Sequence, residues 1–326
     1  MASSTSSPEK LADGEQTSFS TAVPECVRKS CYEYRGVIMP NFMPLRCMTS
    51  LENMTVRPDD TFVITYPKSG TTWMQQIMLL VTFEGDISKI QEEHVTLLIP
   101  FLDLVDIFHH PHDWVNAPSV VDMVSEMPSP RMMKTHSPNT FLPLEIKSDD
   151  PKVKVIYVAR NPKDAAVSYY HFCRFIEFLP TYESWDVFFE EFLAGRAPQG
   201  SWFENVLPWW KRRNHPNVLF LTYEGMKKDH RGAVEKVARF MGKSLTDDVI
   251  DRIVEASTFS SMKKSSKANP DSVVVISDEE KKKGSSFMRK GAIGDWKNYF
   301  TEDQNRRFDE LYAKEMAGSG LELQFE

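Results

Sequence analysis

Lysine, glycine and hydroxyl side chains follow one predicted strand in an order suited to holding an anion. The apolar run 61–66 leads into PKSGTTW (residues 67–73) and then into an amphipathic helix. The first backbone N–H groups of a helix have no internal partners and point toward any group bound there. Gly70 lets the main chain approach that group closely, and Lys68 adds a mobile positive charge. We therefore predict an anion site at residues 68–73 rather than a solvated polar turn.

This loop differs from the Walker loop of many nucleotide-binding enzymes. That motif reads G-x-x-x-x-G-K-[ST], with the lysine after the second glycine and a hydroxyl placed for Mg²⁺. Here Lys68 precedes the only glycine of the loop, which predicts a phosphate-like ligand held without an obligatory metal. Three histidines lie close together further along the chain, namely His109, His110 and His112. They are interpreted as incidental residues of a loop rather than as metal ligands, because no second cluster of metal ligands supports them.

A second anion site is predicted where the strand-like run 153–159 ends at Arg160. Asn161 is a good N-cap and Pro162 suits the first helical position, so a helix begins directly after the arginine. Open α/β proteins bind ligands at this carboxyl edge of the sheet. Ser168 falls near the second turn of the same helix. A strand-end arginine paired to a carboxylate is the alternative, and Arg160 alone does not decide between the two.

The C-terminal part adds two more cations beside a glycine, in FMRKG (residues 287–291). A run of charge is usually a solvated face, but this one lies among hydrophobic residues and leads into Gly294-Asp295-Trp296. Two separate anion sites on one sheet edge imply a nucleotide with phosphates at both ends.

The elements that must position these residues alternate between β-branched runs and amphipathic helices. Strands are predicted at 61–66, 131–134, 153–159 and 218–222. Helices are predicted at 71–83, 163–176, 184–193, 203–213, 231–241 and 247–255. This alternation predicts an α/β fold, a single domain with a central parallel sheet flanked by helices. We expect a flexible N-terminal tail at 1–23, a domain at 24–326 and a long mobile segment at the lysine-rich stretch 263–284.

Composition excludes several classes of function. The 326 residues carry a net charge of −7, which argues against broad nucleic-acid binding. The start of the chain lacks the apolar core of a secretory signal, and the apolar run 77–83 is far shorter than the ~20 residues that cross a bilayer. We therefore expect a cytoplasmic protein without membrane association. The scattered cysteines are interpreted as free, mostly buried thiols: Cys26, Cys31, Cys47 and Cys173.

Three motifs together closely resemble those of the cytosolic sulfotransferases. They are YPKSGTTW (66–73), YVARNPKDAAVSYYHF (157–172) and RKGAIGDWKNYF (289–300), within a resemblance that covers roughly residues 32–316. This resemblance implies a single α/β domain around a parallel sheet, related to the P-loop nucleotide kinases. It also implies an enzyme that uses 3′-phosphoadenosine 5′-phosphosulfate (PAPS), releases adenosine 3′,5′-bisphosphate (PAP) and requires no metal.

The same resemblance implies which residues bind the nucleotide. The 5′-phosphosulfate would be cradled, with an indole stacked on the adenine, by Lys68, Ser69, Gly70, Thr71, Thr72 and Trp73. The 3′-phosphate would be bound by Arg160, Ser168, Arg289, Lys290 and Gly291. The adenine and ribose would be lined by Tyr223, Ser257, Phe259, Phe287 and Met288. Ser257 is a mild departure from the family, in which threonine is expected, although either residue offers a hydroxyl.

Catalysis is implied to depend on three residues of the family pattern. His136 would be the general base, because the unperturbed pKa of histidine, ~6.5, lies near working pH. A lone histidine outside this pattern would instead be interpreted as structural. Lys134 would stabilise charge on the sulfuryl oxygens, and Lys68 would neutralise the bridging oxygen of the leaving bisphosphate.

The acceptor is implied to be a small lipophilic molecule with a hydroxyl or an amine. A phenol, a steroid alcohol, a bile alcohol and an amine all remain open, because the pocket loops are where such families differ. Phe101 and Phe172 are candidate lining residues, and so are Tyr34, Phe42 and Phe108. The alternative for each of these aromatic residues is a place in the core.

The family's dimer motif, Lys-x-x-x-Thr-Val-x-x-x-Glu, is degraded in this chain. Lys297 and Thr301 fit the motif, but Glu302 replaces the valine and Arg306 replaces the glutamate. The usual dimer contact is therefore doubtful, and a monomer and a dimer both remain open.

Three other functions compete with this interpretation. A metal-dependent nucleotide kinase on the same fold is disfavoured by the position of Lys68 and by the second anion site. A Golgi carbohydrate sulfotransferase would need a membrane anchor, and none is visible in the sequence. A sensor that binds PAPS without turnover would need neither Lys134 nor His136.

Overall fold

The computed structural model describes residues 19–107 and 116–326 of the chain. Most of the predicted tail lies outside these ranges, and so do Phe108, His109, His110 and His112. Within the described ranges, none of the helices combines the length and the apolar character that crossing a bilayer requires.

A four-stranded parallel sheet forms the centre of the described structure, in the order β4-β3-β5-β6. Its strands are β3 (Thr61–Thr65), β4 (Met132–Thr135), β5 (Lys154–Ala159) and β6 (Val218–Thr222). All of β3 is buried, as is β5 beyond its first residue. Such apolar strands are typical of a parallel sheet covered on both faces. The predicted parallel sheet is confirmed, and each predicted strand end lies within one residue of the observed one.

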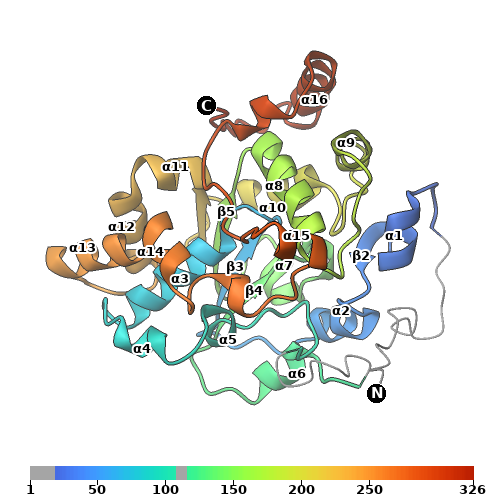
Figure 1. Ribbon diagram of the computed structural model, residues 1–326. Coiled ribbons are helices and arrows are strands. Elements are labelled where there is room, and N and C mark those ends of the chain that lie inside the picture. Colours follow the sequence, from blue (N-terminus) through green and yellow to red (C-terminus); the bar gives the residue numbers. More distant parts are fainter. Residues whose placement is uncertain (1–18, 108–115) are drawn as a thin grey trace.

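Helices cover both faces of the sheet (Figure 1). On one face α3 (Thr71–Thr82), α12 (His230–Phe240) and α13 (Asp247–Ala256) pack together. The core on the other face is built with α8 (Pro162–Phe175), α9 (Trp185–Leu193) and α10 (Trp202–Lys211). These helices match the six predicted ones, and their ends differ from the predictions by at most two residues.

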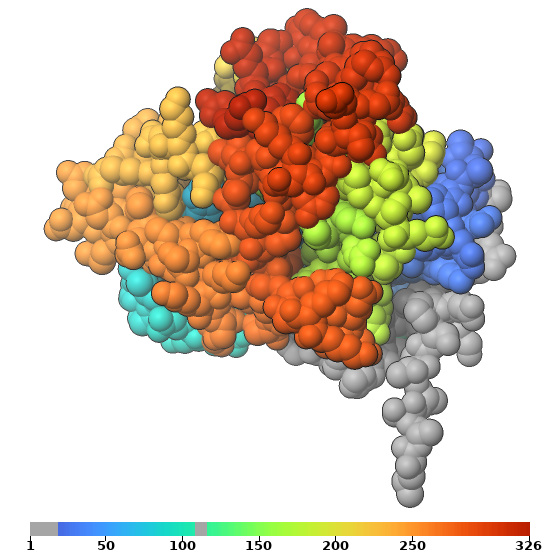
Figure 2. All heavy atoms as spheres, turned by 45° about the horizontal axis from the view of Figure 1, so that its top comes forward, coloured from blue at the N-terminus to red at the C-terminus, as the bar shows by residue number. Residues whose placement is uncertain are grey.

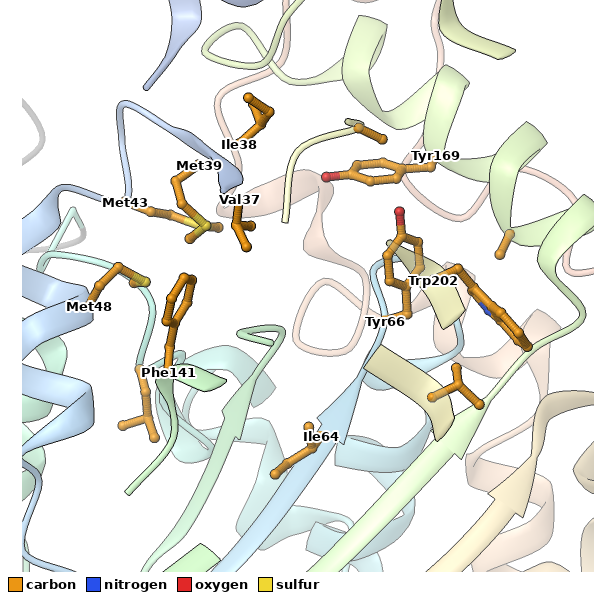
Figure 3. Packing of buried hydrophobic residues seen from close by; sticks show 14 of the residues in the cluster. Val37, Ile38, Met39, Met43, Met48, Ile64, Tyr66, Phe141, Tyr169 and Trp202 are labelled. Carbon is orange, nitrogen blue, oxygen red and sulfur yellow. The ribbon is translucent and has the colours of Figure 1, made fainter. Parts of the chain in front are cut away.

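The sheet separates two clusters of buried hydrophobic side chains, because successive side chains of a strand point to opposite faces. Val63 belongs to the cluster beneath α3, and Ile64 belongs to the larger cluster on the other face. Figure 3 shows part of the larger cluster, in which Tyr66 lies between Trp202 and Tyr169 of α8. The rings of Tyr66 and Tyr169 meet edge to face at 5.9 Å. The loop that follows Tyr66 therefore starts from a well-packed position.

Several elements were absent from the sequence-based prediction. A hairpin of β1 (Cys31–Tyr34) and β2 (Val37–Pro40) pairs antiparallel, and strands this short give little periodicity. α16 (Glu302–Glu315) does have a recognisable start, since Thr301 and Gln304 form a capping box. The other helical elements before residue 259 are α1 (Glu25–Ser30), α2 (Leu45–Glu52), α4 (Ser88–Gln91), α5 (Val95–Leu98), α6 (Val120–Ser125), η2 (Asn139–Phe141), α7 (Leu144–Lys147) and α11 (Tyr223–Lys228).

The lysine-rich stretch 263–284 is not one continuous irregular segment. It contains the end of α14 (Phe259–Lys264), then η3 (Pro270–Ser272) and α15 (Asp278–Lys282). Ser277 N–H donates to Phe175 O at 2.9 Å, which ties the stretch to the end of α8. Figure 2 shows the chain from α14 to η4 (Asp295–Asn298), in orange, crossing the face turned forward. The path of this stretch is thus defined, and its mobility stays a prediction.

Candidate active site

The loop between β3 and α3 has the geometry of an anion site. Gly70 adopts φ +104°, and a Cβ there would lie 2.9 Å from Cδ2 of Tyr223. Only glycine combines this left-handed conformation with such a close approach to the ring. As a result, α3 begins directly beside the Tyr223 ring. The Ser69 hydroxyl and the Trp73 indole N–H are buried and have no hydrogen-bond partner among the described residues. Buried polar atoms without partners indicate a place for a bound molecule.

The second predicted anion site lies at the neighbouring strand end. Asn161 caps α8, and its side chain accepts a hydrogen bond from the backbone N–H of Asp164. The Arg160 guanidinium donates to the carbonyls of Lys68 at 3.1 Å and Ala292 at 2.9 Å, and it lies 4.5 Å from the Tyr223 ring. Its Nε is buried without a partner. The alternative of a carboxylate-paired arginine is therefore not what the structure shows.

The cations of the C-terminal motif are held by one carboxylate. Asp295 accepts hydrogen bonds from Arg289 at 2.5 Å and from Lys290 at 2.6 Å. Burial opposes its ionisation, but these two donors hold the pKa of Asp295 at about 2. Asp164 of α8 accepts from the backbone N–H groups of Gly294 at 2.8 Å and Trp296 at 3.0 Å. The second and third motifs are thus joined through Asp164.

The three motifs surround one cavity of about 400 Å³. Its lining contains most of the residues predicted to bind the nucleotide: Lys68, Gly70, Thr71, Thr72, Trp73, Arg160, Ser168, Tyr223, Phe259, Phe287, Met288, Arg289, Lys290 and Gly291. A second cavity of about 290 Å³ adjoins the first, and Lys68, Ser168 and Arg289 line both of them. The cavity therefore unites the anion sites that lie far apart in the sequence.

Two predicted nucleotide residues lie outside the lining of this cavity. Ser69 is fully buried behind it, with the unpartnered hydroxyl described above. Ser257 is also fully buried, and its hydroxyl donates to Ile253 O at 2.6 Å and contacts His230 at 2.9 Å. Direct contact of Ser257 with a ligand therefore stays a prediction.

His136 lies in the same cavity with one ring nitrogen engaged. Its Nδ1 is 2.9 Å from the Thr65 carbonyl and 3.0 Å from the Thr65 hydroxyl. A carbonyl can only accept, so Nδ1 carries the proton and Nε2 is left with a lone pair. Burial, then the positive charge of Lys134 and Lys68, lowers the pKa of His136 to about 3. The imidazole is therefore neutral near pH 7, as a general base must be.

Asp103 anchors the strand end that carries His136. It is fully buried and accepts from the Thr135 hydroxyl at 2.5 Å, the His136 backbone N–H at 2.8 Å and the Ser137 hydroxyl at 3.0 Å. Burial outweighs these donors and raises the pKa of Asp103 to about 6. This carboxylate holds the backbone N–H of the histidine and the hydroxyls of the residues on both sides of it.

Lys68 and Lys134 are the cavity's two lysines that are at least partly buried and, among the described residues, have no carboxylate salt bridge. Lys68 Nζ lies 3.6 Å from the centre of the Phe287 ring and 4.2 Å from that of Phe172. Burial, with Arg160 and Arg289 nearby, lowers the pKa of Lys68 to about 7. Burial likewise lowers the pKa of Lys134 to about 8, and its Nζ lies 4.7 Å from the Phe101 ring centre. A negatively charged ligand would relieve this accumulation of positive charge.

The remaining wall of the cavity is apolar and contains the predicted Phe101 and Phe172. Phe101 packs edge to face on His136 with centroids 5.0 Å apart. Phe42 also lines the cavity, whereas Tyr34 packs on Phe141 at 5.1 Å and is not among the lining residues. Further apolar lining residues that the sequence analysis did not single out are Leu104, Ile107, Ile176, Leu179 and Val274.

Some functional positions were missed because their signal is weak in sequence. In the sequence Thr65 cannot be distinguished from any other strand residue, and only the structure shows the contact of its carbonyl with His136. Asp103 follows IPFL and could have been noticed as an acid inside an apolar run. Asp164 and Asp295 belong to recognised motifs, yet their partners are distant in sequence.

Comparison with known proteins identifies the class. The sulfotransferase domain model matches residues 58–320, and the chain therefore belongs to the sulfotransferase family. Among its relatives, sulfotransferase 1A1 of the dog is 39% identical and covers 92% of this chain and 97% of its own. Sulfotransferase 1A1 of cattle is 42% identical over 85% of this chain and 90% of its own. The resemblance to cytosolic sulfotransferases inferred from the motifs is confirmed.

Solved structures with the same fold agree with this assignment. Mouse sulfotransferase SULT7A1, complexed with PAP, is 34% identical with a TM-score of 0.70 and covers 89% of this chain and 96% of its own. A retinol dehydratase in complex with retinol and PAP is 25% identical with a TM-score of 0.80, over 93% and 97% of the two chains. The predicted α/β sulfotransferase fold is thus confirmed.

The residues present here fit a nucleotide with phosphates at both ends. The unpartnered atoms of Ser69, Trp73 and Arg160 all belong to the two predicted anion sites. Gly291 has φ +62°, and a Cβ there would clash with the Phe259 ring at 2.5 Å, so glycine is needed for the main chain to pass this ring. Within the described ranges, no group of three or more His, Cys, Asp or Glu residues could hold a metal ion.

Proposed function

We propose that this protein transfers a sulfuryl group from PAPS to the hydroxyl, or amine, of a small lipophilic acceptor, with His136 as general base. The observation that carries this proposal is the state of His136. Thr65 holds its Nδ1–H, so the lone pair of Nε2 is available in a cavity with cationic groups on one wall and aliphatic and aromatic side chains on another.

The relatives support both the donor and the kind of acceptor. Three sulfotransferase-fold structures are complexes with PAP, and two of these also contain retinol or androsterone. Those ligands are apolar molecules, and the wall formed here by Phe101, Phe172 and Ile176 suits such a molecule. We therefore propose a phenol, a steroid or another alcohol as the acceptor of this chain.

Each residue has a task that follows from its charge and position. PAPS, when bound, supplies the sulfuryl group, and its bisphosphate part leaves as PAP. His136 Nε2 takes the proton that the acceptor loses as its oxygen or nitrogen bonds to sulfur. Lys134 and Lys68 counter the negative charge that spreads over the sulfuryl and leaving oxygens. Phe101 holds the plane of the imidazole and excludes water from one side.

We further infer a single domain at 24–326 that works in the cytoplasm on small molecules, without nucleic-acid or membrane partners. The family's dimer motif is degraded, and a monomer and a dimer both remain open. Two of its positions form ion pairs within the chain. Lys297 pairs with Glu326, and Arg306 pairs with Asp303 and Glu310.

The test uses purified full-length protein with sulfur-labelled PAPS and no added metal. The acceptors are a panel of phenols, steroids, bile alcohols and arylamines. We expect labelled product from at least one class, and a loss of about 10²–10⁴-fold in kcat for His136→Ala. PAP affinity, measured by calorimetry, should change by less than about threefold, since a general base contributes to the reaction rather than to binding.

His215→Ala is the matched control, because His215 is half-buried, pairs with Asp150 and lies outside the cavity. It should retain wild-type turnover. Saturable PAP binding without product from any acceptor would reject the proposed reaction and leave a binding protein. Product at an unchanged rate from His136→Ala would reject the role of His136 alone.

A further inference from the structure

The nucleotide end of the cavity contains an imidazole that the proposed reaction does not use. His230 begins α12 and lines the cavity beside Trp73 and Tyr223. Its ring packs edge to face on Trp73 with centroids 5.1 Å apart, and Trp73 packs on Tyr223 at 5.5 Å. The rings of His230, Trp73 and Tyr223 thus lie together where the family resemblance implies that the adenine binds.

Ser257 determines the tautomer of this imidazole. The Ser257 hydroxyl is 2.6 Å from Ile253 O and 2.9 Å from His230 Nε2. A carbonyl oxygen only accepts, so the single hydroxyl proton of Ser257 lies toward Ile253. The Ser257 oxygen must then accept from His230, and Nε2 carries the proton.

The second nitrogen of the ring is consequently an acceptor. Burial, together with the positive charge of Lys227, lowers the pKa of His230, so the ring is neutral near pH 7. With the proton on Nε2, Nδ1 has a free lone pair. None of the residues that the structure describes donates a hydrogen bond to this atom.

We propose that His230 selects adenine by accepting a hydrogen bond from its 6-amino group, and that Ser257 is the positioning residue that orients the ring. An amino group is a donor and suits the Nδ1 lone pair. Hypoxanthine and guanine have a carbonyl oxygen at that position. This oxygen is an acceptor, so it would repel the Nδ1 lone pair of His230 instead of donating a hydrogen bond to it. This inference rests on the proposed use of a purine bisphosphate, and it explains why Ser257 lies behind the cavity wall.

The test measures equilibrium binding of three nucleotides by calorimetry. They are the 3′,5′-bisphosphates of adenosine, inosine and purine riboside. Adenosine has the 6-amino group, inosine has an oxygen at that position, and purine riboside has a hydrogen there. For the wild type we expect tighter binding of the adenosine compound by roughly 10–100-fold, as for other buried donors and acceptors left unpaired. His230→Phe retains a ring but no acceptor. This variant should bind the adenosine compound about tenfold more weakly than the wild type does, and its affinity for the purine riboside compound should stay within about twofold of the wild-type value.

Two serine variants separate positioning from folding. Ser257→Ala should lose most of the preference for adenosine and raise the KM for PAPS with kcat nearly unchanged, whereas Ser257→Thr retains the hydroxyl and should retain the preference. Thermal unfolding shows whether each variant is folded.

The two levels of the proposal fail in different ways. Failure of the wild type to bind any of the bisphosphates would overturn the proposed function and this inference with it. Binding without discrimination among the three bases, or undiminished discrimination in folded His230→Phe, would overturn only the role of His230.

Discussion

The carbonyl of Thr65 decides which nitrogen of His136 can act as a base. The contact at 2.9 Å requires a proton on Nδ1, and the hydroxyl of the same residue lies 3.0 Å from that nitrogen. The Thr65 hydroxyl is itself 2.7 Å from that of Thr71, at the start of α3. The proposed base and the predicted anion loop are therefore linked by adjacent hydrogen bonds.

The protonation state of His136 can be measured directly. Because burial and two lysines lower its pKa to about 3, we expect the ring to stay neutral, with the proton on Nδ1, from about pH 5 to about pH 8. Nitrogen chemical shifts of the histidine rings, assigned with His136→Asn, report both properties. Lys134→Met removes one of the repelling charges and should move the titration of His136 upward. A midpoint between pH 6 and 7 in the ligand-free wild type would contradict the environment described here.

The charge of Lys68 couples nucleotide binding to pH. Its pKa is lowered to about 7 in the ligand-free protein, and a bound bisphosphate would raise it again. Binding should therefore take up protons near pH 8, and affinity for PAP should fall as pH rises through the ligand-free pKa. Calorimetry in buffers of different ionisation enthalpy measures this uptake. Lys68→Met should bind more weakly and take up fewer protons, and equal uptake in both proteins would argue against Lys68 as the source.

At the scale of elements, the site is made by two helix starts and a C-terminal turn. α3 begins after Gly70 without a side-chain cap, so its first backbone N–H groups are free at the carboxyl edge of the sheet. α8 begins at the same edge, where Asn161 caps the N–H of Asp164 and Arg160 lies just before this cap. Asp164 on α8 then holds the turn at Gly294 and Trp296. These contacts place cations from a segment more than a hundred residues away beside both helices.

Gly70→Ala tests the start of α3. The residue has φ +104°, and the added Cβ would lie 2.9 Å from Tyr223. We expect a loss of stability of about 1–2 kcal/mol from the left-handed conformation and a loss of PAP affinity of more than about tenfold from displaced N–H groups.

Gly318→Ala is the matched control for that experiment, because Gly318 lines neither cavity. Gly318 has φ +74°, but no atom lies within 4 Å of the added Cβ. Chemical denaturation should show a comparable loss of stability, whereas calorimetry should show unchanged affinity. Equal affinity losses in the two variants would indicate that general destabilisation, rather than the anion loop, is responsible.

At the scale of the whole molecule, the two ends of the sheet have different tasks. The carboxyl ends of β3, β4 and β5 lead into the cavity, whereas Asp60 and Arg131 precede β3 and β4 at the other end. Arg131 donates to Asp60 at 2.8 and 2.5 Å, and both side chains are almost fully buried. This pair fixes the two strands together, away from the ligand.

Arg131→Met should therefore affect stability and not binding. Removing one partner leaves a buried carboxylate without its counter-ion, which typically costs about 3–5 kcal/mol. Denaturation should show this loss, while PAP affinity measured below the transition should stay within about twofold. Arg306→Met removes only exposed ion pairs and should leave the unfolding midpoint unchanged. A large loss of affinity in folded Arg131→Met would show that the two ends of the sheet are coupled.

Much of the architecture was predictable because periodicity and end signals are local. The strand at Thr61–Thr65, the Asn161 cap and Pro162 define elements within a few residues of chain, and the structure agrees. The hairpin at Cys31–Pro40 was not predictable in this way, because each strand has four residues and is stabilised by contacts with the larger core. Stretch 263–284 looked irregular because its helices are short and polar, and its path depends on hydrogen bonds to α8.

For the site, the sequence by itself determined the chemical types and their order: lysine and glycine before one helix, arginine before another, and lysine and histidine at a strand end. These follow from residue identity and near neighbours. Only the tertiary structure decided that the Thr65 carbonyl accepts a hydrogen bond from His136 Nδ1–H, that Asp295 holds Arg289, and that Ser257 faces His230 rather than the cavity. Hydrogen-bond partners and burial depend on packing between distant segments, and a linear sequence does not specify those distances.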